Sequence, residues 1–194
     1  MPNPDHPYYL LTETCRLHHA TLVAVSKTRS IAEIDIVYQM GQRIFAENRV
    51  QELLEKAPAL PKDIEWHFVG HLQTNKVKFI APYISMIDAV DSMKLLKEIN
   101  KQAEKCGRLI KVLLELHIAT EETKYGLTLD ACRELLDDGD WRMLKNVNIC
   151  GLMMIASNVA DKEHIRREFQ LAADFYDEVK AKYFADVAEF KERS

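Results

Sequence analysis

The sequence is poor in cysteine, and the few cysteines that it has are far apart. The four are Cys15, Cys106, Cys132 and Cys150, and no two of them form a CxxC pair. A disulfide-stapled domain or a zinc site needs denser or closer spacing. We therefore expect all four to be reduced residues of a cytoplasmic protein.

Long apolar runs and long basic runs are also missing. No apolar run approaches the roughly 18 residues of a membrane span, and the N-terminus lacks the pattern of a signal peptide. The formal net charge is -4, which argues against the basic surface that binds nucleic acids. The sequence predicts neither a membrane protein nor a nucleic-acid-binding protein.

Several motifs of catalytic and nucleotide-binding sites are absent. The chain has no GxSxG sequence, no P-loop and no glycine-rich fingerprint after its first strand pattern. His67 and His71 are four residues apart, but they straddle a predicted strand end and lack the glutamate of an HExxH motif, so they do not indicate zinc. We expect His67 to point into the interior of the fold and to be hydrogen-bonded there.

The chain does contain a regular alternation of strand and helix patterns. The predicted strands cover residues 21–26, 43–46, 65–70, 84–89, 109–117 and 148–154. The predicted helices cover residues 30–41, 49–57, 72–80, a stretch after Asp91, 129–138 and 162–183. Six successive βα units mean a parallel sheet with right-handed crossovers, either an open doubly wound sheet or a (β/α)8 barrel. The length favours one domain over residues 1–194.

The fifth predicted strand favours the barrel. Its apolar residues alternate with Lys111, Glu115 and His117, which share the opposite face. A sheet covered by helices on both faces is apolar on both, whereas a barrel interior can become polar toward its mouth. A barrel has eight strands, so the six predicted here are two short.

Residues that favour helix ends mark several boundaries. Gly41 is expected to end the helix that begins near residue 30. Asn48, Asp91 and Thr128 are each placed to cap the start of the helix that follows. Prolines make the first residues irregular, and the pattern leaves room for a short helix over residues 8–20.

Lys27 is the first candidate functional residue. It follows the buried strand pattern of residues 21–26, at the end of the strand where parallel α/β folds carry their ligand chemistry. A lysine there is costly to bury unless its amine is paired or is used in the neutral form. The alternative is a lysine whose aliphatic stem packs while its charge stays in water.

Three further residues are weaker candidates. Asn48 lies where it can reach a ligand held by Lys27, unless it only caps its helix. Lys124, in a polar loop, is either a second functional amine or a solvated loop lysine. Met153 lies in the apolar stretch 151–155, which either lines a flat aromatic ligand or belongs to the core.

Taken together, the order and spacing of five segments are distinctive. They are residues 24–28 (AVSKT), 45–52 (FAENRVQE), 66–76 (WHFVGHLQTNK), 121–126 (EETKYG) and 151–153 (GLM). In these segments the chain resembles the YggS/PROSC family of pyridoxal phosphate homeostasis proteins.

The resemblance implies a (β/α)8 TIM barrel of the alanine racemase N-terminal domain type. It implies that pyridoxal 5'-phosphate (PLP) is held as a Schiff base on Lys27, with Asn48 and Met153 near the pyridine ring. The implied role is intracellular PLP homeostasis: a monomer in the cytoplasm holds the reactive aldehyde and passes PLP to PLP-dependent enzymes, without catalysis of its own. The alternatives are a PLP-dependent amino-acid racemase or decarboxylase, and a barrel scaffold that binds no cofactor.

The chain departs from the family pattern in three ways. Ala46 stands where the family usually has glycine, and the family's long first helix is not evident in residues 1–20. The family also continues beyond the position of Ser194 with two more strands and the segment that binds the phosphate. We therefore expect a barrel with about six βα units, in which the last strands are missing.

Overall fold

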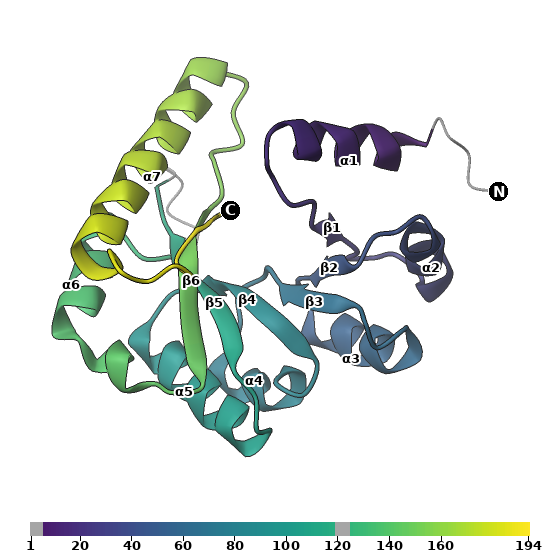
Figure 1. The fold of residues 1–194 in the computed structure, drawn as a ribbon, viewed down its shortest axis with the longest axis horizontal. Helices are drawn as coiled ribbons and strands as arrows, with labels where there is room; N and C mark the ends of the chain where they lie inside the picture. The colour runs from purple at the N-terminus through teal and green to yellow at the C-terminus, as the bar shows by residue number, and fades with distance from the viewer. Residues whose placement is uncertain (1–5, 119–124) are drawn as a thin grey trace.

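The computed structural model describes residues 6–118 and 125–194 (Figure 1). Residues 121–124 of the EETKYG segment, Lys124 among them, lie outside this described part. The strands are β1 (Ala24–Val25), β2 (Ile44–Glu47), β3 (Glu65–Phe68), β4 (Ile84–Val90), β5 (Ile110–Leu116), β6 (Val147–Met154) and β7 (Glu192–Arg193). The helices are α1 (Pro7–Leu17), α2 (Ile31–Gln39), α3 (Val50–Ala59), α4 (Thr74–Ile80), α5 (Met93–Lys105), α6 (Leu129–Asp138) and α7 (Lys162–Tyr183), with a 3-10 turn, η1, at Asp140–Met143.

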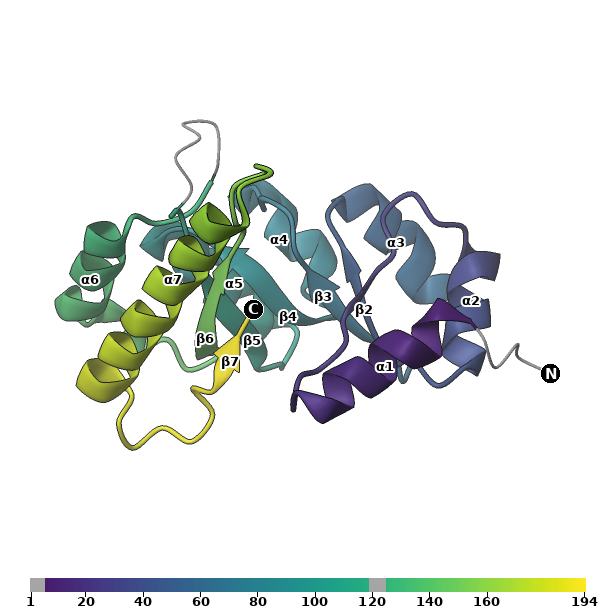
Figure 2. The ribbon, with the colours of Figure 1, turned by 90° about the horizontal axis from the view of Figure 1, so that it is seen from above.

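The seven described strands form one parallel sheet in the order β1 to β7. Each strand pairs with its neighbour in sequence, as right-handed crossovers require. The sheet is curled, with α2 to α5 around its outer side and with α1 and α7 at its two ends (Figures 1 and 2). The result is an open part of a (β/α)8 barrel.

The sequence predicted six strands, and the structure has one more within its described residues. Strand β7 is only Glu192–Arg193, and it pairs with Gly151 and Leu152 of β6. Two charged residues carry no apolar alternation, so no strand pattern could have revealed them. Gly151 permits the pairing, because a Cβ built on it would lie 1.9 Å from the carbonyl oxygen of Glu192.

The helix ends follow from local hydrogen bonds. Ser30 and Glu33 form a capping box at the start of α2. Thr128 caps α6 by accepting the N–H of Ala131 at 3.1 Å, as predicted. The predicted bounds of α6 and α7 are those observed. Gly41 follows the end of α2 and has a φ of 112°, a conformation that favours glycine.

Two of the predicted caps are wrong. The N-cap of α3 is Arg49, without a side-chain hydrogen bond, so Asn48 does not cap the helix. The N-cap of α5 is Ser92, whose hydroxyl accepts the N–H of Leu95. Asp91 is instead engaged by His71, with 3.2 Å between Oδ2 and Nδ1.

The two faces of the sheet bury different side chains. The outer face packs against the helices in the main core, which includes Ile110, Val112 and Leu114 of β5 at 0% exposure. The inner face has a separate small cluster that joins three strands, made of Met86, Ala89, Leu113, Cys150 and Met153. The inner face is also polar, because Lys111 lines a cavity of about 630 Å³ with His67 and Asp88. The polar interior predicted from the fifth strand is therefore observed.

Helix α7 buries only part of its apolar residues. Tyr176 and Val179 are buried, whereas Phe169 is 50% exposed. Glu168 is buried in addition, because its carboxylate accepts the N–H and hydroxyl of Ser157. None of the helices in the described part combines the length and apolar character needed to cross a bilayer.

Candidate functional site

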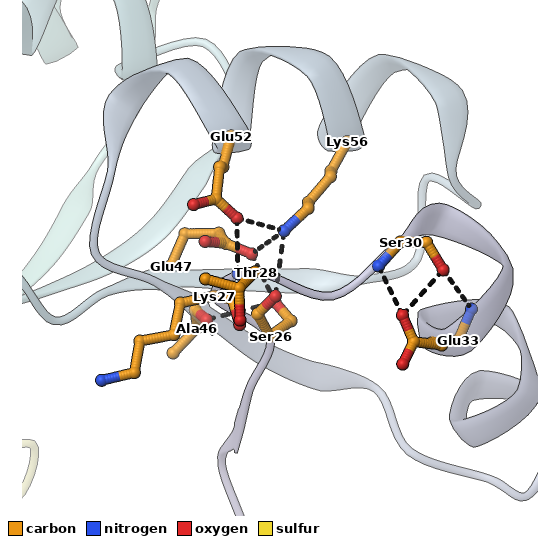
Figure 3. A network of polar contacts seen from close by, with 9 residues as sticks. All are labelled: Ser26, Lys27, Thr28, Ser30, Glu33, Ala46, Glu47, Glu52 and Lys56. Carbon is orange, nitrogen blue, oxygen red and sulfur yellow. Dashed lines mark hydrogen bonds and ion pairs between the residues drawn. The ribbon is translucent and has the colours of Figure 1, made fainter.

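Lys27 lies just beyond β1, at the carboxyl end of the parallel sheet. Its side chain is exposed, and Figure 3 shows it extending away from the polar network behind it. The predicted position at the strand end is therefore correct. Of the two alternatives for this lysine, the exposed charge is the one observed, and the amine is not buried.

The backbone turns sharply after Lys27. Thr28 has a φ of 64°, in the left-handed region that a β-branched residue rarely adopts. Its N–H donates to Glu52 Oε2 at 2.8 Å, and its hydroxyl donates to the carbonyl of Lys27 at 2.6 Å. The turn after Lys27 is therefore both strained and hydrogen-bonded.

A buried network lies behind this turn (Figure 3). Lys56 Nζ of α3 donates to Glu47 Oε1 at 2.7 Å, to Glu52 Oε2 at 2.7 Å and to the carbonyl of Ser26 at 2.9 Å. Ser26 Oγ donates to the same Glu47 oxygen at 2.7 Å. Burial by itself lowers the pKa of Lys56, but the hydrogen bonds to Glu47 and Glu52 outweigh it and raise that pKa.

Asn48 lies at the neighbouring strand end. The β1–β2 ladder continues through a hydrogen bond from the N–H of Ser26 to the carbonyl of Ala46, at 2.9 Å. Lys27 and Asn48 thus follow adjacent strands at about the same level. Asn48 Oδ1 is buried and has no hydrogen-bond partner among residues 6–118 and 125–194. Gly70 makes room for this segment, because a Cβ there would lie 2.5 Å from the Asn48 carbonyl oxygen.

The backbone at position 46 accommodates alanine as well as glycine. Positive φ occurs at only two non-glycine residues of the described part, His19 and Thr28. Ala46 therefore has an ordinary backbone angle, and it is fully buried. The glycine expected from the family pattern is not required by the backbone here.

Met153 lies on β6, which β3, β4 and β5 separate from β2. It is 4% exposed and belongs to the small inner cluster. The structure therefore brings Lys27 and Asn48 to adjacent strand ends but holds Met153 on another part of the inner face. Both predictions for Met153, ligand lining and core packing, remain compatible with this position.

Glu115, which the sequence singled out only for its face, is the register partner of Met153. Burial, and secondarily the negative charge of Asp91, raises the pKa of Glu115 from 4.5 to about 7. Its Oε2 atom and His117 Nδ1 have no partner within the described residues. Such atoms are costly to bury unless a bound group pairs with them.

The two histidines of the WHFVGHLQTNK segment have separate partners. His67 is buried and lies 3.3 Å from Asp88 Oδ2 through Nδ1, as the sequence predicted for an inward histidine. His71 pairs with Asp91 and stacks on Tyr125, with 3.8 Å between ring centroids. The two rings therefore belong to different side-chain clusters.

These residues fit a small polar cofactor with an aldehyde and a ring. Lys27 offers an exposed amine, and Asn48 offers an unpaired amide oxygen one strand away. Glu115 and His117 add buried polar atoms without partners in the described part. A group bound on the inner face would pair with such atoms.

Sequence reasoning missed the network around Lys56. Lys56 lies on the buried face of α3 with Val50, Leu53 and Ala57. A lysine among the apolar residues of one helix face is the sequence signal that indicates a buried, paired amine. Its partner could not be identified from the sequence, because only the fold brings Glu47 of β2 next to Lys56.

Comparisons with known proteins agree with this geometry. The alanine racemase N-terminal domain family matches residues 6–189. The pyridoxal phosphate homeostasis protein of Aquifex aeolicus is 38% identical over 165 residues, which are 84% of this chain and 72% of the relative. The protein of the same name in Synechocystis is 40% identical over 136 residues, which are 69% of this chain and 62% of the relative.

Solved structures give the same result. PipY of Synechococcus elongatus without PLP has a TM-score of 0.83 and 30% identity, over 91% of this chain and 83% of PipY. PipY with PLP bound has a TM-score of 0.80 and 29% identity, over 91% of this chain and 82% of PipY. Alanine racemase of Clostridium difficile has a TM-score of 0.69 over 93% of this chain and 49% of the racemase, and at 14% identity this likeness shows the fold alone. The fold is therefore that of the alanine racemase N-terminal barrel, and the chain belongs to the family of pyridoxal phosphate homeostasis proteins.

Proposed function

We propose that this chain binds PLP through Lys27 and takes part in intracellular PLP homeostasis. The observation that carries the proposal is the position of Lys27. It is an exposed amine at the carboxyl end of the first barrel strand, on a turn held by hydrogen bonds on both sides. Family membership supports the same cofactor, because PipY, 29% identical, has been solved with PLP bound.

PLP supplies an aldehyde that reacts with an amine, and a phosphate and a ring that need polar partners. Lys27 would supply the amine and hold the cofactor through Nζ. Asn48 would contact the cofactor from the adjacent strand end, where its Oδ1 is buried without a partner in the described residues. Met153 lines the more distant side of the same inner face.

The role that follows is that of a carrier. Binding to one lysine would keep the free aldehyde concentration low, and because the link is reversible the cofactor could be released to PLP-dependent enzymes. We propose that the chain does this as a monomeric single domain in the cytoplasm, without catalysing a reaction itself. Four free cysteines, two of them buried, support a reducing compartment.

An amino-acid racemase or decarboxylase is the second candidate. Glu115, with a pKa of about 7, is a group that could exchange protons near neutral pH. It is buried beside Met153 on the inner face, however, whereas the Lys27 side chain is exposed beyond β1. An assay of alanine racemisation and decarboxylation with added PLP separates the two candidates, and turnover would overturn the carrier role.

The Lys27→Ala variant tests the binding role. The chain and the variant are each mixed with PLP and desalted, and their absorbance spectra are compared. We expect the cofactor band to be retained by the chain and lost in Lys27→Ala. Equal retention by Lys27→Ala would contradict the proposal, and Lys62→Ala, an exposed lysine on another loop, is the matched control.

A further inference from the structure

One buried network holds the backbone on both sides of Lys27. On the N-terminal side, the carbonyl of Ser26 accepts from Lys56 Nζ at 2.9 Å. On the C-terminal side, the N–H of Thr28 donates to Glu52 Oε2 at 2.8 Å, and that oxygen also accepts from Lys56 at 2.7 Å. Both peptide groups that flank Lys27 therefore depend on Lys56.

The network is far more buried than a helix surface ion pair. Lys56 is 4% exposed and Glu47 is fully buried. Removing an ammonium and a carboxylate from water costs more free energy than their mutual attraction returns, unless further hydrogen bonds complete the site. Lys56 has three acceptors at 2.7–2.9 Å, but Glu47 Oε2 is buried with no hydrogen-bond partner in the described residues. The hydrogen bonds of the network therefore do not fully offset its burial, and stability alone does not account for it.

The strained turn indicates that task. Thr28 is held at a φ of 64°, which an L-residue leaves unless its surroundings prevent it. The hydrogen bond from its N–H to Glu52 is a restraint of that kind. The same hydrogen bond holds the peptide group between Lys27 and Thr28, and with it the backbone that carries the Lys27 side chain.

We propose that Lys56, together with Glu47 and Glu52, is a positioning residue for Lys27. It fixes the peptide groups before and after Lys27 and thereby aims the reactive amine. Figure 3 shows the Lys27 side chain extending away from these three residues, so their link to Lys27 runs through the backbone on either side of it. The inference rests on the proposed role of Lys27 as the amine that binds PLP.

Lys27 and Lys56 differ in their surroundings, and this difference decides which of them can react with the cofactor. Hydrogen bonds to Glu47 and Glu52 raise the pKa of Lys56 against the effect of burial, so it stays protonated. A protonated amine does not attack an aldehyde. Lys56 therefore does not compete with Lys27 for the cofactor.

Two variants remove the anchor that Lys56 gives to the Ser26 carbonyl and to Glu52. Lys56→Met deletes the three donated hydrogen bonds, but it leaves Glu47 buried without its partner and can unfold the chain. The double variant Glu47→Leu/Lys56→Met removes both charges, and replacement of a buried ion pair by apolar residues is often tolerated. Glu168→Gln is the matched control, because Glu168, on α7, is also a buried acid that accepts several hydrogen bonds.

Two readouts are taken on each folded variant. The first is the rate of PLP attachment to Lys27, followed by absorbance and assigned by borohydride reduction and peptide mass mapping. The second is the hydrogen exchange rate of the Thr28 amide, which needs no cofactor. We expect attachment in the double variant to be at least about tenfold slower, since small misplacements of a reacting group carry penalties of that size. We expect Thr28 exchange to rise as well, and both rates to be unchanged in Glu168→Gln.

The outcomes separate this inference from the proposed function. Attachment within twofold of the unmodified chain, in a folded double variant, would overturn the positioning role while the binding role stands. If the unmodified chain does not attach PLP at Lys27, the binding role fails. The Thr28 amide then decides alone: unchanged protection in the double variant overturns the inference, and lost protection supports it.

Discussion

Glu115 of β5 and Met153 of β6 are register partners, so a buried carboxyl group lies beside a thioether on the inner face of the sheet. Burial raises the pKa of Glu115 to about 7, and the charge of Asp91 adds to the effect. Glu115 therefore binds a proton more readily in the folded chain than in the unfolded one. Its contribution to stability is fully present below about pH 4.5 and is lost as the pH rises through about 7.

We expect Glu115→Gln to remove this pH dependence. Relative to the variant, the unmodified chain should lose roughly 2–3 kcal/mol of unfolding free energy between pH 5 and pH 8, as a shift of this size implies. Urea denaturation at the two pH values measures the difference. Glu55→Gln, on the exposed side of α3, is the control and should leave the profile unchanged. Parallel profiles for the chain and Glu115→Gln would contradict the assignment.

The left-handed turn after Lys27 should make stability sensitive to the residue at position 28. Its φ of 64° suits glycine, whereas the left-handed conformation costs free energy for alanine and threonine because they have a Cβ atom. We expect Thr28→Gly to be more stable than Thr28→Ala by about 0.5–1 kcal/mol, after allowance for the greater freedom of glycine in the unfolded chain. Thermal or urea unfolding of the two variants checks this, and an alanine variant of equal or higher stability would refute the strained turn.

The pairing of β7 with β6 should depend on the absence of a side chain at Gly151. A Cβ at this position would lie 1.9 Å from the Glu192 carbonyl oxygen, so Gly151→Ala should push β7 off β6. The N–H of Ser194 donates to the Leu152 carbonyl at 3.0 Å, and we expect its hydrogen exchange to become at least about tenfold faster. Overpacking of this kind costs about 1–3 kcal/mol.

Gly107→Ala is the control for this experiment. Gly107 has a positive φ of 63°, which Gly151 does not have, and a Cβ there would meet no atom within 4 Å. It reports the effect of backbone strain alone and should leave the Ser194 amide protected. Faster exchange of that amide in Gly107→Ala, or protection in Gly151→Ala, would contradict the close-packed β6–β7 pair.

Much of the fold could be predicted from the sequence, because local patterns determine it. Thr128 marks the start of α6, and the apolar spacing along α7 delimits that helix. A local pattern predicts the wrong helix cap where the capping side chain makes a tertiary contact instead. Asp91 has the chemistry of a cap, but its carboxylate is taken by His71 from another strand end. Asn48 also has the chemistry of a cap, but the N-cap of α3 is the next residue, Arg49, and Asn48 Oδ1 has no partner in the described residues.

The candidate site also has one part that the sequence predicts and another that depends on tertiary contacts. Lys27 could be found from the sequence, because a lysine after an apolar strand is a local pattern. The partners of Lys56 lie on β2, in the loop after β1 and on its own helix, and no local pattern connects them. The raised pKa of Glu115 likewise depends on burial, which only the curled sheet creates.

The central claim is that Lys27 is the amine that binds PLP, and its most direct test is to map the modified lysine. The chain is mixed with PLP, desalted, reduced with borohydride and digested, and the modified peptides are identified by mass. We expect a single major adduct, on Lys27. Adducts spread over exposed lysines, or concentrated on another lysine, would contradict the account.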